Sequence, residues 1–222
     1  MPSNFFDAIL FDMDGTLIDS EPLWLISEQE LMARYDFEWT EVNQAFCLGG
    51  PLDRVGNYMS SLADSVKDGQ YFTDTLISLM AQKLAKGAPC MPGALALLDL
   101  VEELHMRFAL VSASPRVLVD GVLTNLATHH FEVSISSDDV VKTKPDPEGY
   151  LKAAARLGVD ISRCLVLEDS ATGVQSAVAS GACVVAIPHL VSIAETDRIR
   201  TILTLEELTH EKLQEFYGQW FD

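Results

Sequence analysis

Two aspartates that stand two residues apart are the part of this sequence best suited to chemistry. Asp12 and Asp14 belong to the hexapeptide Phe-Asp-Met-Asp-Gly-Thr at 11–16, which directly follows an apolar run. Carboxylates crowded at the end of a strand repel one another and lose hydration unless a cation or a proton resolves the conflict. A divalent metal would do so, and one carboxylate is then available as a nucleophile.

Further polar residues follow other apolar runs of the chain. Ser112, Ala113 and Ser114 come after the run 108–111, and Glu168-Asp169 comes after the run 165–167. Lys144 lies a few residues beyond another apolar run. Because ligand sites of open parallel sheets lie at the carboxyl ends of the strands, we expect these side chains at one edge.

The acids of this set suit a magnesium-dependent phosphoryl transfer. Asp12, Asp14 and Asp169 can together hold one Mg²⁺, a hard cation that prefers oxygen ligands and leaves room for a phosphate oxygen. Such a metal lowers the charge barrier between an anionic nucleophile and an anionic substrate.

The remaining polar residues suit the phosphate itself. The Ser112 hydroxyl can donate to a phosphate oxygen, and the backbone amides of Ala113 and Ser114 offer partial positive charge at the expected start of a helix. The Lys144 ammonium would neutralise charge on both the phosphate and the acids. Lys142 is a competitor for this role, but Lys144 is the lysine that a proline follows.

The elements that must position these residues alternate between strands and helices. Short apolar runs predict buried strands at 6–11, 107–112, 133–136, 164–167 and 182–187. Helical patterns between and around the later runs cover 93–105, 115–126, 147–157 and 173–180. This alternation predicts an α/β fold with a Rossmann-like, doubly wound and mainly parallel sheet. Gly181 is expected to end one helix, and Ser170 or Thr172 to begin it.

Residues 17–89 have a different pattern. Helical stretches at 23–35 and 73–86 dominate, and a segment with two prolines and two glycines at 86–93 ends the region. We therefore expect an all-helical cap domain at 17–89, inserted into an α/β core domain made of 1–16 and 90–222. A last helix is expected at 205–222.

Composition excludes several classes of protein. The 222 residues include 48% hydrophobic and 22% charged residues, which is typical of a folded globular protein. A net charge of −18 argues against nucleic acid or an anionic membrane as a partner. Four scattered cysteines give neither a disulfide framework nor a zinc motif, and no targeting or membrane-spanning pattern is visible. We expect a cytoplasmic monomer.

The four ordered motifs resemble those of the haloacid dehalogenase superfamily, and specifically its phosphatases with a helical cap inserted after the first motif. The resemblance rests on Asp12-Met13-Asp14-Gly15-Thr16, Ser112, Lys144 ahead of Pro145, and Glu168-Asp169, and it spans nearly the whole chain. It implies that Asp12 forms an aspartyl-phosphate, while Asp14 protonates the leaving alcohol and then activates water.

The resemblance also implies the metal ligands and the region that recognises the substrate. Mg²⁺ would be held by the Asp12 carboxylate, the Asp14 backbone carbonyl and Asp169, with Glu168 close by or acting through water. In the cap, Trp24 either packs as part of a hinge or lines the substrate pocket. Gly49-Gly50 is either a plain turn or a loop that approaches the substrate. The implied partner is a small phosphorylated metabolite, a sugar phosphate above all, since a cap of about seventy residues would obstruct a folded protein.

The residues also bear on four other interpretations of this sequence. An EF-hand fails because the loop positions counted from Asp12 hold Thr16, Leu17 and Leu23 where ligands and a glycine are required. A sugar phosphomutase of the β-phosphoglucomutase type shares the motifs, but Trp24 stands where that enzyme has a histidine. A haloalkanoate dehalogenase has no need of Asp14. A non-catalytic protein that only binds a phosphorylated ligand or a partner would have no chemical need for the complete set, which is Asp12, Asp14, Ser112, Lys144 and Asp169.

Overall fold

The computed structural model describes residues 5–47, 51–126, 128–188 and 192–221. Contacts between Cα atoms divide the chain into two compact units. The first comprises 1–19, 89–119 and 126–222, and the second comprises 20–88 and 120–125. The division into an α/β core domain of 1–16 and 90–222 and a helical cap domain of 17–89 stays a prediction.

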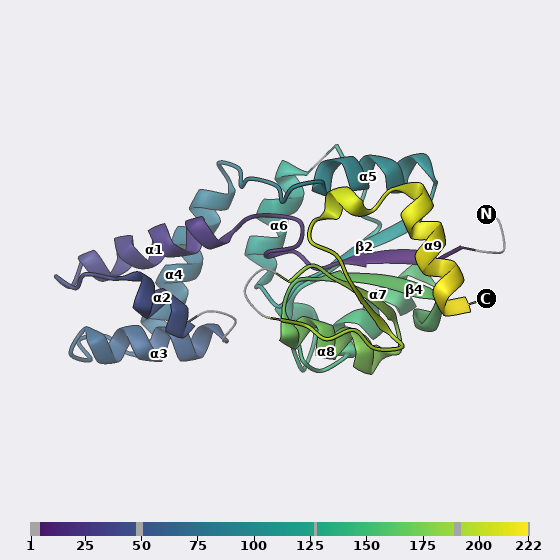
Figure 1. Cartoon of the computed structure of the whole chain (residues 1–222). Helices are drawn as coiled ribbons and strands as arrows, with labels where there is room; N and C mark the ends of the chain where they lie inside the picture. The colour runs from purple at the N-terminus through teal and green to yellow at the C-terminus, as the bar shows by residue number, and fades with distance from the viewer. Residues whose placement is uncertain (1–4, 48–50, 127, 189–191, 222) are drawn as a thin grey trace. The chain divides into compact units, whose positions relative to one another are not determined.

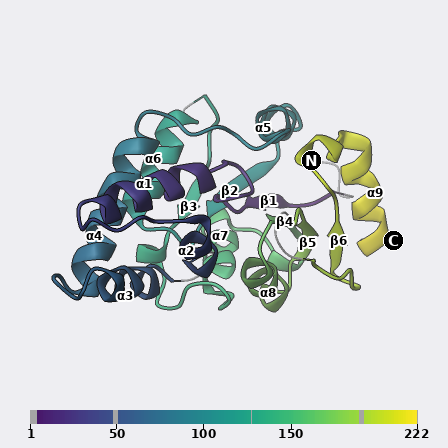
Figure 2. The same cartoon turned by 60° about the vertical axis from the view of Figure 1, so that its left-hand side comes forward.

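The first unit is built on a six-stranded sheet in which every pairing of neighbours is parallel. Its strands are β1 (Ala8–Phe11), β2 (Arg107–Val111), β3 (Val133–Ile135), β4 (Cys164–Glu168), β5 (Cys183–Ala186) and β6 (Ile199–Thr201). Their order is β3-β2-β1-β4-β5-β6, which Figure 2 shows side by side. This is the order of a doubly wound Rossmann-like sheet, so the predicted fold class is confirmed.

Strand β1 is the centre of this sheet, and its composition explains the position. All four of its residues, Ala-Ile-Leu-Phe, are buried, as expected for a strand covered on both faces. The five predicted strands are present, with ends shifted by one or two residues. Strand β6 was not predicted because its three residues include an arginine and a threonine, and a short edge strand leaves no continuous apolar run.

Helices cover both faces of the sheet (Figure 1). Helices α7 (Glu148–Leu157) and α8 (Ala171–Ser180) pack on one face, where the core includes Leu10, Val166 and Ala177. Helix α5 (Ala94–Glu103) packs on the other, against β2, and α9 (His210–Phe221) packs the ring of Tyr217 against Phe6, two residues before β1. Short 3₁₀ turns complete the unit: η1 (Ser137–Asp139), η2 (Ile161–Arg163) and η3 (Leu205–Glu207).

Helix α8 shows how the local sequence sets its ends. The Ser170 hydroxyl accepts a hydrogen bond from the Gly173 amide at 3.0 Å, so Ser170 is the N-cap. Gly181 ends the helix with φ +92°, a left-handed conformation that favours glycine. The predicted caps are confirmed, with Ser170 rather than Thr172 at the start. The helix therefore begins directly after the acids of β4.

Helices and the turns that join them make up the described residues of the second unit, with no strand among them, in agreement with the expected composition of the cap. Its helices are α1 (Glu21–Ala33), α2 (Glu41–Cys47), α3 (Leu52–Leu62) and α4 (Gly69–Leu84). The second half of α6 (Arg116–Asn125), residues 120–125, also belongs to this unit. Its core is separate from the sheet and includes Leu31, Met59 and Phe72.

One carboxylic acid is buried inside this helical unit. Glu28 on α1 is only 4% exposed and accepts a hydrogen bond from the indole nitrogen of Trp39 at 2.9 Å. Burial raises its pKa from 4.5 to about 7, an effect that the Trp39 bond opposes and nearby Glu21 reinforces. Glu28 therefore exchanges its proton near neutral pH.

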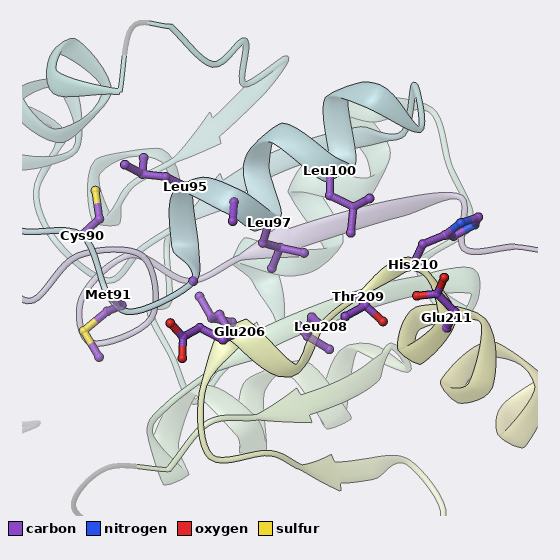
Figure 3. Close-up of a pocket in the computed structure, with 13 residues that line it drawn as sticks. Cys90, Met91, Leu95, Leu97, Leu100, Glu206, Leu208, Thr209, His210 and Glu211 are labelled. Atoms are coloured by element: carbon purple, nitrogen blue, oxygen red, sulfur yellow. The ribbon is translucent and has the colours of Figure 1, made fainter.

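A cavity of about 690 Å³ lies in the first unit, between α5 and the segment 205–211 (Figure 3). Leu97 and Leu100 of α5 line one side, and Leu208 lies on the other. Gly93 has φ +83°, and a Cβ built on it would lie 2.3 Å from the Glu206 amide nitrogen, so glycine permits the close packing of η3. None of the predicted site residues that the structure describes lines this cavity.

Among the described residues, no helix combines the length and apolar character that a membrane crossing needs.

Candidate active site

Three neighbouring strands deliver polar side chains to one edge of the sheet. Asp12 directly follows β1, Ser112 directly follows β2, and Glu168 is the last residue of β4, with Asp169 next. The register aligns Phe11 with both Leu110 and Leu167, so the carboxyl ends of the three strands lie level. Because these strands are adjacent in the sheet, residues far apart in the sequence lie close together at this edge.

Lys144 lies between two of these acids. Its ammonium group donates hydrogen bonds to Asp12 Oδ1, to Glu168 Oε1 at 2.6 Å and to the Val111 carbonyl at 2.9 Å. All three ionic side chains are at least nine-tenths buried. Removing any one of these side chains would leave an unpaired buried charge, which strongly destabilises a folded protein.

The electrostatics of the group show an excess of negative charge. Burial is the largest cause that raises the pKa of Asp12 well above its usual value; the negative charge of Glu168 raises the pKa further, and Lys144 lowers it. Burial alone would lower the pKa of Lys144, but Asp12 and Glu168 raise it well above the ordinary value. The lysine therefore stays charged, while the acids require more positive charge than it provides.

A divalent cation fits the part of the site that Lys144 does not neutralise. Carboxylate oxygens of Asp12, Glu168 and Asp169 lie within 4.8 Å of one another. Burial raises the pKa of Asp169 to about 7, with Glu168 as the next cause. Clustered, desolvated oxygen ligands of this kind are the donor set that Mg²⁺ and Ca²⁺ prefer. The residues present therefore fit a hard divalent metal.

The side chain of Asp14 faces the serines that follow β2. Its Oδ2 accepts a hydrogen bond from Ser114 Oγ at 2.8 Å and a longer one from Ser112 Oγ at 3.4 Å. The two aspartates of the first motif thus have different surroundings, since Asp12 contacts Lys144. This separation is what a division of labour between a nucleophile and a proton carrier requires.

The loop after β2 differs in detail from the expected phosphate cradle. Helix α6 begins at Arg116. The helix would have to begin two residues earlier for the Ser114 amide to lie in its first turn. The Ser114 amide donates to Ser112 Oγ at 2.9 Å, which holds the loop in a tight turn. Ala113 is exposed at the tip of this turn. The roles of Ser112, Ala113 and Ser114 in phosphate binding remain predictions.

The residues predicted for substrate contact in the cap are less well defined. Trp24 lies on α1, is half-buried and packs against the core of the helical unit, as expected for the hinge interpretation. Contact with a substrate remains a prediction. Gly49 and Gly50 lie outside the described residues.

The sequence did not predict several groups that hydrogen-bond or make room for the acids of the site. Tyr150 on α7 donates its hydroxyl to Glu168 Oε1 at 2.8 Å, and Ser170 Oγ donates to Glu168 Oε2 at 3.1 Å. Two glycines make room for the acids, since a Cβ on Gly15 would lie 2.3 Å from Asp169 Oδ2 and one on Gly173 would lie 1.8 Å from Glu168 Oε1. Only Gly15 carried a signal in the sequence, because it follows Asp14.

The acid–lysine cluster lies at the carboxyl ends of the central strands of a parallel sheet, which is where doubly wound α/β proteins bind their ligands. Comparisons with known proteins give the family. Residues 9–187 match the family model of the haloacid dehalogenase-like hydrolases. The chain belongs to this family, and it is a hydrolase of that type.

Relatives of known name agree with this assignment. The chain is 32% identical to hexitol phosphatase B of Escherichia coli over 184 residues, which cover 82% of this chain and 83% of the relative. It is 27% identical to a fructose-1-phosphate phosphatase of the same organism, over 79% of this chain and 93% of the relative. Among solved structures, a family IA hydrolase from Entamoeba histolytica matches with a TM-score of 0.82 and 26% identity, covering 96% of this chain and 99% of that one.

Proposed function

We propose that this protein is a Mg²⁺-dependent phosphatase that hydrolyses a small phosphomonoester, of the sugar-phosphate class, through an aspartyl-phosphate on Asp12. The observation that carries the proposal is the buried contact of Lys144 with Asp12 and Glu168 beside Asp169. The named relatives support the substrate class, since they are phosphatases of hexitol phosphates and fructose 1-phosphate.

In the first step, a carboxylate oxygen of Asp12 attacks phosphorus and the bond from phosphorus to the ester oxygen breaks. Lys144 holds the attacking carboxylate and offsets the negative charge that accumulates as it approaches an anionic ester. Asp14 gives its proton to the departing alcohol oxygen. The products of this step are the free alcohol and a phosphorylated Asp12.

In the second step, Asp14, now a carboxylate, removes a proton from a water molecule, and the water oxygen attacks phosphorus. The bond between Asp12 and phosphorus breaks, which releases inorganic phosphate and restores both aspartates. Asp12 and Asp169, with Glu168 nearby, would hold Mg²⁺, which when bound supplies positive charge to the phosphate oxygens and to the nucleophile.

The test is hydrolysis of p-nitrophenyl phosphate and a panel of sugar, nucleotide and glycolytic phosphates with Mg²⁺, followed by release of inorganic phosphate. Asp12→Asn should abolish turnover. Asp7→Asn is a matched control, because Asp7 precedes the same strand but pairs with Arg163 at 3.1 Å. Turnover retained by Asp12→Asn would remove Asp12 as the nucleophile, and a wild-type protein inactive on the whole panel would refute the proposal.

The same panel separates a phosphatase from a phosphomutase. A mutase would convert β-glucose 1-phosphate to glucose 6-phosphate without net release of phosphate. We propose hydrolysis because Trp24 occupies the position at which the resemblance places a histidine in the mutase.

We also propose that the protein acts as a cytoplasmic monomer with no nucleic-acid partner. Its four cysteines are all free thiols, three of them buried, which suits a reducing compartment. Its net charge of −18 opposes binding to polyanions. Light scattering coupled to gel filtration tests the oligomeric state, and a dimer at micromolar concentration would contradict it.

A further inference from the structure

The phenol of Tyr150 contacts the site, but neither the motifs nor the proposed mechanism uses it. It is the third residue of α7 and its side chain is fully buried. Its hydroxyl donates a hydrogen bond of 2.8 Å to Glu168 Oε1, the same oxygen that Lys144 contacts at 2.6 Å. The centre of its ring lies 5.1 Å from the Lys144 nitrogen, within the range of a cation–π contact.

The surroundings of Glu168 show why this hydroxyl matters. An ionised carboxylate has about four acceptor positions, two on each oxygen. In Glu168, Oε1 accepts from Lys144 and Tyr150, while Oε2 accepts from the amide and the hydroxyl of Ser170, at 3.3 and 3.1 Å. All four positions are used, so the carboxylate cannot rotate without losing a charge-assisted hydrogen bond.

The space around Glu168 is equally restricted. The first turn of α8 closes over its carboxyl group, and a Cβ on Gly173 would lie 2.0 Å from the carboxyl carbon. Glu168 has 0% exposed surface. The orientation of its Oε1 is therefore set by Tyr150 and Lys144, while Ser170 fixes the other oxygen.

We propose that Tyr150 is a positioning residue, which fixes the Glu168 carboxylate so that the Lys144 ammonium stays against Asp12. This inference rests on the proposed function, in which Lys144 holds the attacking carboxylate. Without the hydroxyl, Oε1 keeps only its bond to Lys144, and the lysine can follow the carboxylate away from Asp12. Groups that orient catalytic residues in this way are commonly worth roughly 10- to 100-fold in activity.

The test compares Tyr150→Phe with the control Tyr217→Phe. Both changes delete one phenolic oxygen in the same unit, but the Tyr217 hydroxyl accepts a hydrogen bond from Arg163, which directly precedes β4 at the end opposite to the site acids. We expect Tyr150→Phe to lower kcat and kcat/KM together by roughly 10-fold or more, and Tyr217→Phe to change neither. Equal kcat values for the two variants would overturn the proposal.

A second readout does not depend on activity or on metal. Lysine-selective NMR of the ammonium groups should show a protected Lys144 signal, assigned by its loss in Lys144→Arg. We expect this signal to shift or broaden in Tyr150→Phe and to stay in place in Tyr217→Phe. An unchanged Lys144 signal would overturn the proposal even if kcat falls. If the wild type hydrolyses no ester, the proposed function fails, whereas the NMR comparison still decides the role of Tyr150.

If Tyr150→Phe does not fold, Ser170→Ala tests the premise of the proposal, namely that the hydrogen bonds of Glu168 keep Lys144 against Asp12. That change frees the other oxygen of the same carboxylate. A fall in kcat with a displaced Lys144 signal supports the positioning role of the Glu168 contacts, and no change in either measurement contradicts it.

Discussion

Replacing Gly173 by alanine tests whether the first turn of α8 is shaped around the Glu168 carboxylate. In an ordinary helix this exchange stabilises a protein by about 0.5–1 kcal/mol, because alanine loses less backbone entropy on folding. Here the new Cβ would lie 1.8 to 2.1 Å from three atoms of the Glu168 carboxyl group. Glu168 must therefore move, and its contacts determine the cost.

The magnitude follows from those contacts. Movement of the carboxyl group breaks at least one of its hydrogen bonds to Lys144, Tyr150 or Ser170. A hydrogen bond to a charged group is worth roughly 1.5–3 kcal/mol. After the gain in helix propensity is subtracted, Gly173→Ala should destabilise the fold by roughly 0.5–2.5 kcal/mol. Gly173→Ala is thus expected to destabilise the protein, whereas the same exchange in an ordinary helix stabilises it.

The assay is urea unfolding together with kcat on p-nitrophenyl phosphate. Gly121→Ala is the matched control, because Gly121 lies in α6 and a Cβ there meets only Leu84 Cβ at 3.4 Å. We expect the control to be at least as stable as the wild type, and Gly173→Ala to be less stable and at least 10-fold slower. The reasoning is refuted if Gly173→Ala stabilises the protein as the control does and keeps its kcat.

Three further outcomes are expected. Saturating Mg²⁺ should raise the free energy of unfolding by about 2.7 kcal/mol at 100 times its Kd, and thermal unfolding should show no such gain in Asp169→Asn. Gly15→Ala should cost about 1–2 kcal/mol for its φ of +79° and should raise the Mg²⁺ concentration needed for activity, because its Cβ meets Asp169. The pKa of Glu28 is about 7 in the folded state against an ordinary 4.5. Between these two pH values the folded protein keeps a proton on Glu28 that the unfolded chain has lost, so the free energy of unfolding falls as pH rises from about 4.5 to about 7. Glu28→Gln should reduce the difference between urea unfolding at pH 5 and pH 8 by up to roughly 3 kcal/mol; an equal difference in both proteins would contradict the assignment.

The predictable part of the fold was the part with continuous apolar runs. Strands β1, β2, β4 and β5 are each buried on both faces, so their sequences are uninterrupted and identify them directly. Strand β6 at the sheet edge and the short helix α2 lack such a pattern, because partial exposure admits polar residues. Helix α3 was not specified within the helical cap, since its sequence includes a glycine and an asparagine, which are weak helix formers.

The candidate site divides in the same way. Asp12, Asp14, Ser112, Lys144 and Asp169 were found because they follow strands that the sequence makes visible. Tyr150 could not be found, since a tyrosine on the apolar face of a helix looks like an ordinary core residue. The sequence also carried no sign that Gly173 is required, because the group that excludes a side chain there, Glu168, belongs to the preceding strand β4. Contacts of this kind depend on register and packing rather than on spacing along the chain.

The central position of β1 has a consequence for how the protein is made. Ala8 pairs with Arg107 on one side and with Cys164 on the other, 99 and 156 residues further along the chain. At 5–20 residues per second, β4 is synthesised roughly 8–30 s after β1. During that interval the apolar β1 segment lacks its second neighbour, whereas α1 to α4 meet mostly partners close in sequence and can fold early. The acids of the site therefore come together late in folding, and a nascent chain that stops before β4 carries Asp12 on an unpaired, aggregation-prone edge.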